Sequence, residues 1–236
     1  MDLREHRIRS DFLDNERSLW MLEAADPEAP ADLVIFLDGE YYRDGVDAPS
    51  VIERLQADGL IGNTLAVFVS MESVASRWIE CPCHAPFAAF VVDECLPWIE
   101  SQYPDLTENR VIVGLSYTGL AAAFTALSGP GKFSAVIAQS GSFWWNENWL
   151  DTQIPSVCPS HPTRFYLSVG SREVKPRVEH KEGVIQRCSQ IEGVERFHRA
   201  LTQQGYVTHH TLFDGGHDFL DWRKDLGSAL RWALGD

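Results

Sequence analysis

The sequence predicts an α/β fold in which a mostly parallel, doubly wound sheet carries helices on both of its faces. Short apolar runs typical of buried strands alternate with segments of helical periodicity. Most of the apolar runs end at glycine-containing or polar loops, as expected where a strand ends. The chain has 236 residues, of which 44% are hydrophobic and 23% charged, values typical of a globular protein. We therefore expect one domain over residues 1–236.

The elements follow one another in a simple order. Two antiparallel strands are expected first, over residues 4–10 and 17–24, with a polar turn at 14–16. The apolar runs that predict the remaining strands are 33–37, 65–69, 110–114, 135–138, 165–169 and 206–213. The segments that predict helices are 50–56, which Ser50 would cap, 86–101, 117–127, 185–204 and 219–234. Pro97 should kink or locally end its helix, and residues 146–162, with three prolines, should form a long irregular excursion.

The charge and the apolar runs limit the partners of the chain. A formal net charge of −14 argues against nucleic acid as a partner, because phosphate binding depends on clustered Lys and Arg. No apolar run approaches the roughly 20 residues of a spanning helix, and the charged amino terminus leads into no signal-peptide core. We therefore expect no membrane contact and a cytoplasmic location.

The cysteines predict neither a disulfide framework nor a metal site. They are Cys81, Cys83, Cys95, Cys158 and Cys188. An odd number in a chain without an export signal indicates free thiols. The segment 81–84, Cys-Pro-Cys-His, has no second ligand pair at a comparable spacing, so we expect no metal and no organic cofactor.

The segment 111–119, Val-Ile-Val-Gly-Leu-Ser-Tyr-Thr-Gly, predicts a buried strand that meets a helix at Ser116. In the G-x-S-x-G elbow of α/β-hydrolases such a turn exposes a nucleophilic serine. Thr118 occupies the position of the second glycine, and Gly119 follows one residue later. The alternative is a serine that merely caps the helix.

Two further residues favour the nucleophile. In α/β-hydrolases the acid and then the histidine follow the serine along the chain. Glu173 follows the strand expected at 165–169, and His217 follows the strand expected at 206–213. His217 would act as the general base, and Glu173 would orient it. The alternative for Glu173 is a solvated loop charge, and for His217 a histidine in a glycine-rich turn.

An oxyanion intermediate needs two backbone N–H donors. Elbow geometry assigns one to Tyr117. We expect the other in the loop after residue 37, with the Glu40 N–H as the candidate.

Five separated motifs together resemble the enterochelin esterases and the wider esterase family of D type. They are Leu37-Asp38-Gly39-Glu40, Arg77-Trp78-Ile79-Glu80, the elbow at Ser116, the aromatic run 139–145 and Gly215-Gly216-His217-Asp218. The resemblance extends from about residue 30 over nearly the whole chain. It implies hydrolysis of ester bonds in catecholate siderophores such as enterobactin, releasing iron in the cytoplasm. It also implies Ser116 and His217 as catalytic residues, with Glu173 at the acid position; some members work with a Ser-His dyad.

The chain departs from this family in two respects. Thr118 replaces the usual elbow glycine, and we expect the additional amino-terminal domain of the larger enterochelin esterases to be missing. The wider family also includes S-formylglutathione hydrolases, feruloyl esterases and mycolyltransferases, so the fold alone does not fix the acyl group.

Substrate contacts are predicted from aromatic and basic loop residues. The candidates for a wall against a catechol ring are Trp144, Trp145, Tyr41 and Tyr42, together with Phe143 and Trp222. Three consecutive bulky aromatics at 143–145 are difficult to bury together, which favours an exposed wall. Arg77 is the candidate for anionic oxygens of the substrate. The alternative is that the aromatics pack the loops and Arg77 pairs with Glu80 or Glu72.

The sequence thus predicts a serine carboxylic-ester hydrolase that acts on a small-molecule ester through an acyl-enzyme on Ser116. Acyl transfer or thioester hydrolysis by the same nucleophile is one alternative. A catalytically inactive binding protein on the same fold is another, because Thr118 departs from the elbow motif.

Overall fold

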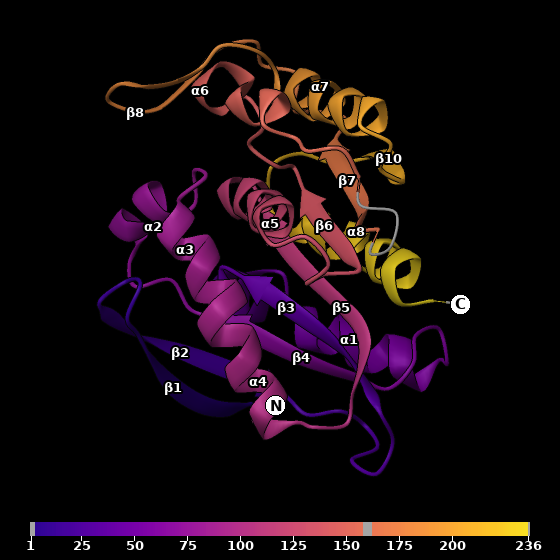
Figure 1. The fold of residues 1–236 in the computed structure, drawn as a ribbon. Helices are drawn as coiled ribbons and strands as arrows, with labels where there is room; N and C mark the ends of the chain where they lie inside the picture. The colour runs from indigo at the N-terminus through magenta and orange to yellow at the C-terminus, as the bar shows by residue number, and fades with distance from the viewer. Residues whose placement is uncertain (1–2, 158–161, 236) are drawn as a thin grey trace.

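The computed structural model describes residues 3–157 and 162–235, and its centre is one twisted sheet (Figure 1). The strands of this sheet are β1 (Arg4–Ser10), β2 (Asn15–Leu22), β3 (Ala31–Leu37), β4 (Thr64–Val69), β5 (Leu106–Leu115), β6 (Ala135–Gln139), β7 (Arg164–Gly170) and β10 (Thr208–Phe213). Their spatial order is β1-β2-β4-β3-β5-β6-β7-β10. A separate hairpin consists of β8 (Val178–Lys181) and β9 (Val184–Gln186).

The direction of the strands confirms the expected mostly parallel sheet. β1 and β2 pair antiparallel, as do β2 and β4, whereas the strands from β4 to β10 in the spatial order pair parallel. The chain passes from β3 outward to β4 and then returns to β5 on the other side of β3. In doubly wound sheets ligands bind at such a reversal, beyond the carboxyl ends of the strands. The loops after β3 and β5 therefore meet where a site is expected.

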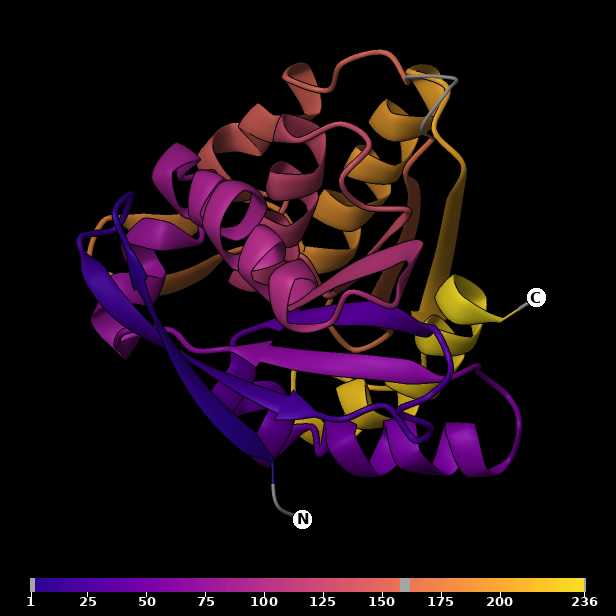
Figure 2. The ribbon, with the colours of Figure 1, turned by 60° about the horizontal axis from the view of Figure 1, so that its bottom comes forward.

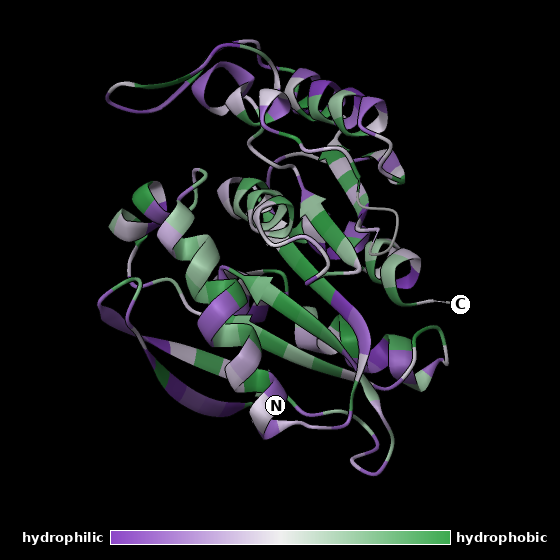
Figure 3. Cartoon of the chain, viewed as in Figure 1, coloured by the Kyte–Doolittle hydropathy of each residue, from purple (hydrophilic) through white to green (hydrophobic). Residues whose placement is uncertain are grey.

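Helices cover both faces of the sheet, as the alternation of elements predicts (Figures 1 and 2). The helical elements are η1 (Tyr41–Gly45), α1 (Ala48–Ala57), α2 (Val74–Glu80), α3 (Ala85–Ala89), η2 (Phe90–Cys95), α4 (Leu96–Gln102), α5 (Tyr117–Ser128), α6 (Trp145–Asn148), η3 (Trp149–Thr152), α7 (Gln190–Gln203) and α8 (Phe219–Leu234). One core lies between the sheet and α3, η2, α4, α5 and α7, and the other between the sheet and η1, α1 and α8. The inner strands are apolar because both of their faces are covered (Figure 3).

Pro97 changes the helix expected at 86–101 without ending it. The segment forms α3, the π-helical turn η2 and α4 in direct succession. The N–H of Leu96 donates to the carbonyl of Val91, five residues back. A π turn directly before a proline adjusts the backbone where the ring would otherwise clash with the preceding turn.

Two expected helix starts are wrong. Ser50 does not cap a helix, because α1 already begins at Ala48, and the Ser50 hydroxyl donates to the Asp47 carboxylate over 2.8 Å. The helix expected from residue 185 begins only at Gln190, after Ser189, which accepts from the Glu192 N–H in a capping box. The apolar residues before it belong to β9, where pairing with β8 outweighs their local helical pattern.

The described cysteines agree with the expectation of free thiols. Cys81, Cys83, Cys95 and Cys188 are unpaired, and Cys158 lies outside the described residues. Burial raises the pKa of the Cys95 thiol to about 12. A thiol of this kind is unreactive at neutral pH.

Candidate active site

The junction of β5 and α5 forms the sharp turn that the sequence predicts. Ser116 lies between the two elements with φ 52° and ψ −118°. Residues other than glycine rarely adopt this backbone conformation. Gly114 makes the turn possible, because a Cβ atom there would lie 2.0 Å from the carbonyl oxygen of Thr118. Strain of this kind places a serine hydroxyl at the open end of a strand.

Thr118 strengthens this elbow in place of the usual glycine. Its hydroxyl accepts from the Leu115 N–H over 3.1 Å and lies 2.9 Å from both the Leu115 carbonyl and the Asp38 Oδ2, either of which can accept its proton. The close backbone approach occurs one residue later, where a Cβ on Gly119 would lie 3.0 Å from the Gly141 Cα. The close approach that favours glycine thus occurs at 119, and the side chain at 118 joins the elbow to the loop after β3.

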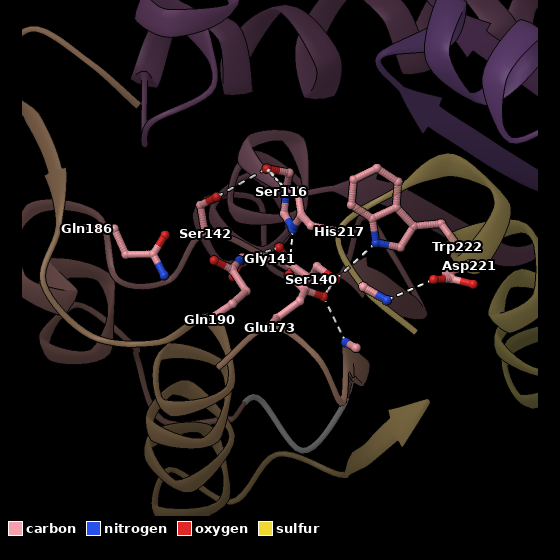
Figure 4. Close-up of polar contacts among 12 residues, drawn as sticks. Ser116, Ser140, Gly141, Ser142, Glu173, Gln186, Gln190, His217, Asp221 and Trp222 are labelled. Carbon is pink, nitrogen blue, oxygen red and sulfur yellow. Dashed lines mark hydrogen bonds and ion pairs between the residues drawn. The ribbon is translucent and has the colours of Figure 1, made fainter. Parts of the chain in front are cut away.

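Three predicted residues meet at the carboxyl ends of β5, β7 and β10 (Figure 4). The Ser116 Oγ lies 3.0 Å from the His217 Nε2, and the His217 Nδ1 lies 2.5 Å from the Glu173 Oε2. A carboxylate only accepts hydrogen bonds, so the Nδ1 carries the proton and the Nε2 lone pair faces the serine. The Ser142 hydroxyl lies 3.5 Å from the Ser116 Oγ.

The carboxylate of Glu173 is buried, whereas the imidazole is accessible. The Glu173 side chain is 4% exposed and the His217 side chain 40%. The other carboxylate oxygen, Oε1, accepts from the Ser140 hydroxyl over 2.5 Å and from the Gly170 N–H over 2.8 Å. The sequence alone did not predict a role for Ser140, although its position directly after β6 was visible.

The loop that carries His217 is fixed by Asp221, at the start of α8. The Asp221 carboxylate accepts from the Gly216 N–H over 2.8 Å and pairs with Arg172 and with Lys224. The hydrogen bond from Lys224, with that from Gly216, lowers the pKa of Asp221 to about 2. The histidine loop is thus tied to α8 by a carboxylate that stays ionised at neutral pH.

Arg77, the predicted contact for anionic substrate oxygens, is paired within the protein. Its Nε and Nη2 donate to the Asp38 carboxylate at 2.8 to 2.9 Å, and the two side chains are 11% and 2% exposed. Burial opposes the charge of Arg77, but the Asp38 carboxylate raises the pKa of the guanidinium. Neither alternative partner is used: Glu80 instead pairs with the buried Arg17. A role for Arg77 toward substrate remains a prediction.

Of the two expected oxyanion donors, Tyr117 directly follows Ser116, and Glu40 lies in the segment after β3, whose Asp38 carboxylate is 2.9 Å from the Thr118 hydroxyl of the elbow. Tyr117 is the first residue of α5, so its N–H lies at a helix amino terminus. Asp38 has φ 58°, and a Cβ on Gly39 would lie 2.7 Å from the Phe68 carbonyl carbon, which explains the glycine there. The Glu40 carboxylate accepts from the Met71 N–H over 3.3 Å, and burial raises its pKa. The oxyanion roles of Tyr117 and Glu40 stay predictions.

Most of the predicted aromatic wall is packed inside the protein. Tyr42 is fully buried, and its hydroxyl donates to Gln139, so its expected contact with a substrate is wrong. Phe143 stacks on Phe197, and Trp144, which is 4% exposed, donates from its Nε1 to Gln190. The expected exposed wall is therefore wrong for Phe143 and Trp144, because α7 covers these two rings, whereas Trp145 is half-buried.

The remaining aromatic candidates lie nearer the surface. Tyr41 is half-buried and packs against Phe219 with a ring separation of 5.3 Å. Trp145 lines a hollow of about 600 Å³ between α6 and the β8–β9 hairpin. Ser116 and His217 do not line this hollow, so a large volume alone does not mark the candidate site. Trp222 is buried, and its ring edge lies against the His217 ring, 4.7 Å between centroids.

Two smaller hollows border the histidine and the Asp38 loop. One, of about 300 Å³, is lined by Arg172, Glu173, Lys175, Val178, His180, Gln186, Gln190 and His217. The other, of about 290 Å³, is lined by Asp38, Glu40, Tyr41, Met71, Glu72, Ser73, Val74 and Arg77. The first lies beneath the β8–β9 hairpin, which sequence reasoning missed. His180 of this hairpin stacks on Trp144 with rings 4.8 Å apart, and burial lowers its pKa.

The described part of the chain offers neither a metal-binding cluster nor a helix suited to a membrane crossing. In residues 3–157 and 162–235, no group of three or more His, Cys, Asp or Glu side chains is arranged to hold a metal ion. No helix within these ranges combines the length and apolar character that a membrane crossing requires.

The fold and the order of Ser116, Glu173 and His217 define an α/β-hydrolase. The sequence matches the family described as "Putative esterase" over residues 15–233, and the chain belongs to this family.

Named relatives include the iron(III) enterobactin esterase of Dickeya dadantii, 31% identical over 232 residues, which cover 96% of this chain and 53% of that protein. The iron(III) enterobactin esterase of Escherichia coli K12 is 28% identical and matched over 94% of this chain and 54% of its own length. The chain thus spans about half the length of these relatives. The crystal structure of the enterobactin esterase of Shigella flexneri in the presence of enterobactin superposes with a TM-score of 0.83 at 25% identity, covering 99% of this chain and 59% of that one.

Proposed function

We propose that this chain is a serine esterase that hydrolyses ester bonds of a catecholate siderophore related to enterobactin. The observation that carries the proposal is the line of contacts from the Ser116 Oγ to the His217 Nε2, at 3.0 Å, and from the His217 Nδ1 to Glu173, at 2.5 Å. The first distance lies within the reach that a nucleophile and its base require, and the second is a short contact between the base and the acid that orients it.

The reaction begins with attack of the Ser116 oxygen on the ester carbonyl carbon. The serine proton passes to the His217 Nε2, and the imidazolium remains hydrogen bonded to Glu173. The carbonyl oxygen becomes an oxyanion that the N–H groups of Tyr117 and Glu40 stabilise. The intermediate then collapses, and the leaving alkoxide takes the proton from His217 as alcohol.

Water completes the cycle. His217 takes a proton from the water molecule, whose oxygen attacks the acyl carbon bound to Ser116. Collapse of this second intermediate breaks the bond to the serine oxygen, which recovers its proton from His217. The products are a free carboxylic acid and the original enzyme.

The substrate class is supported by the relatives and by charge. The matched proteins from Dickeya dadantii and Escherichia coli are enterobactin esterases by name. Of the two cations that line the hollow beside His217, Arg172 pairs with Asp214 and Asp221, so Lys175 forms the basic rim there, although the chain as a whole has a net charge of −14. A local basic rim on an acidic protein attracts an anion such as a catecholate. The proposal places this hydrolysis in the cytoplasm, where it would release iron.

The first experiment tests the nucleophile. Ser116→Ala should abolish hydrolysis of a short-chain aryl ester, and a fluorophosphonate should label the wild type at Ser116, as peptide mass mapping would show. Ser142 has its hydroxyl in the same site but no histidine within bonding distance in the described contacts, so it should stay unlabelled. Unchanged turnover by Ser116→Ala would refute the mechanism.

The second experiment tests the substrate. Turnover of ferric enterobactin, iron-free enterobactin and a neutral aryl ester should be compared at low and high salt. We expect KM for the anionic catecholates to rise with salt, because salt screens the basic rim, while KM for the neutral ester stays constant. Lys175→Ala should weaken this salt dependence. Hydrolysis of the aryl ester without turnover of either siderophore would reject the proposed substrate but keep the esterase.

A further inference from the structure

Four neighbouring strands each lead into one member of a continuous line of hydrogen-bonded side chains. In the spatial order β5, β6, β7, β10, these side chains are Ser116, Ser140, Glu173 and His217, the last two lying in the loops that follow their strands. The catalytic mechanism proposed above uses three of the four. Ser140 occupies the remaining strand end, between the nucleophile and the acid.

The hydroxyl of Ser140 has a fixed direction. It is fully buried and lies 2.5 Å from the Glu173 Oε1 and 3.0 Å from the indole Nε1 of Trp222 (Figure 4). An indole N–H can only donate, so it occupies a lone pair of the serine oxygen. The serine proton is therefore directed at the carboxylate of Glu173.

This proton, with one backbone group, determines how the carboxylate is turned. The Gly170 N–H donates to the same oxygen, Oε1, over 2.8 Å. Both neutral donors thus hold Oε1, and Oε2 is left for the His217 Nδ1. A carboxylate held by only one donor could rotate and lose alignment with the imidazole.

The backbone at Ser140 adopts a conformation that glycine adopts more easily than any residue with a side chain. Its φ is +48°, a region in which glycine is favoured over serine. The conformation is held by the Ser140 N–H, which donates to the Ser168 carbonyl over 2.7 Å, and by Gln190, which donates to the Ser140 carbonyl over 2.5 Å. The strained position carries a hydroxyl although a glycine would fit its backbone more easily.

We infer that Ser140 is a positioning residue for the esterase reaction, and that Trp222 orients it. Ser140 holds the Glu173 carboxylate so that Oε2 stays aligned with the His217 Nδ1 while the imidazole gains and loses its proton. This inference rests on the proposed function, because it requires that the histidine acts as the base.

The test is a pair of substitutions that remove the hydroxyl in different ways. Ser140→Ala and Ser140→Gly should each lower kcat for an aryl ester about tenfold or more, with KM nearly unchanged, since a hydrogen bond to a charged group is lost. Ser140→Gly also relieves the backbone conformation, so an equal loss in both variants assigns the effect to the hydroxyl. Trp222→Phe, which keeps a ring but removes the N–H, should lower kcat by about threefold.

A double-mutant cycle separates positioning from general support of the fold. In a Glu173→Gln background, Ser140→Ala should have no further effect on kcat, because the group it positions has already been changed. The matched control is Ser168→Ala, which removes another buried hydroxyl that donates to a carboxylate, that of Asp225, over 2.6 Å. The control should lower the melting temperature as much as Ser140→Ala but leave kcat near the wild-type value.

The outcomes are distinct. Wild-type kcat in both Ser140 variants, or an undiminished effect of Ser140→Ala in the Glu173→Gln background, would overturn the inference. An active Ser116→Ala variant would instead overturn the proposed function itself. Loss of kcat in Ser140→Ala, Ser140→Gly and the Ser168→Ala control alike would show a structural role only, and this also overturns the inference.

Discussion

Two buried carboxylates lie on opposite sides of Ser116, and their partners differ in kind. Asp38, in the loop after β3, pairs with the guanidinium of Arg77, and its side chain is 2% exposed. Glu173, in the loop after β7, receives its hydrogen bonds from neutral donors and from His217. The first charge is therefore neutralised permanently, whereas the second lies beside a group that becomes charged only during the proposed reaction.

This difference assigns different tasks to the two sides. A buried ion pair that is complete in the resting protein fixes geometry, because neither charge can leave the other without a large penalty. A buried carboxylate beside a neutral imidazole instead stabilises the imidazolium that forms when the serine proton is transferred. We expect damage on the Glu173 side to lower turnover and damage on the Asp38 side to lower stability.

The largest expected effect is that of Glu173→Gln on kcat. The amide has nearly the same size but no negative charge, and its NH₂ group can hold His217 in the wrong tautomer. We expect kcat for an aryl ester to fall by roughly 10³ to 10⁴ while the melting temperature changes little. The measurement is steady-state kinetics beside a thermal melt. Glu195→Gln is the control and should keep full activity, because this α7 side chain is 45% exposed and pairs with Arg199. A loss below about threefold would indicate a Ser-His dyad and remove the contrast between the two sides.

Asp38→Asn should act mainly on stability. The substitution leaves Arg77 buried without a compensating charge, so the free energy of unfolding should fall by about 3–5 kcal/mol. Urea denaturation checks this. Asp47→Asn is the matched control, because the side chains of its ion pair with Arg223 are 37% and 42% exposed, and breaking a solvent-exposed pair changes stability by about 0–1 kcal/mol. Equal losses in the two variants would show that the Asp38 pair contributes no more than a surface contact.

Much of this arrangement was predictable from local sequence, and the reasons are physical. The apolar runs of the inner strands reflect burial on both faces, which any order of strands in a parallel sheet would require. The order of Ser116, Glu173 and His217 follows because parallel strands deliver their carboxyl ends to one edge. These residues could be predicted without knowing which strands are neighbours.

The contacts of side chains across the sheet could not be predicted in this way. Arg77 and Asp38 are 39 residues apart, and their pairing depends on where α2 packs over the loop after β3. Trp144 is buried because α7 and the β8–β9 hairpin cover it, and this hairpin has no strong local pattern. The sequence shows which polar and aromatic residues follow a strand. Contacts with segments far away in the sequence determine whether each of them faces the substrate or packs inside the protein.

Thr118 offers a smaller test of the Asp38 side. Thr118→Val keeps the shape but removes the hydroxyl, leaving the buried Leu115 N–H without this acceptor. We expect a loss of about 1–3 kcal/mol in the free energy of unfolding and a smaller loss of kcat, since the elbow is loosened. The control is Thr125→Val on the same helix, because the Thr125 hydroxyl is buried without a hydrogen-bond partner, and its removal should be neutral or stabilising. Equal destabilisation by both substitutions would contradict a role for the Thr118 hydroxyl bonds.

The smallest expected effect concerns Asp221, a third carboxylate, which resembles Asp38 in its cationic partners but lies on the Glu173 side. Its pKa falls from 3.8 to about 2 in the folded chain, chiefly through Lys224. A lowered pKa stabilises the fold above the unfolded value and ceases to do so as pH falls through the folded value.

Asp221→Asn should therefore be less stable than the wild type by about 1–2 kcal/mol at neutral pH. The gap should narrow between about pH 5 and pH 2, as the wild-type carboxyl takes up its proton. Urea midpoints of both proteins at several pH values measure this gap. If it stayed constant down to pH 2, the carboxylate charge would not be what holds the His217 loop. Among the three carboxylates compared, a stabilising ion pair would then be a feature of the Asp38 side only.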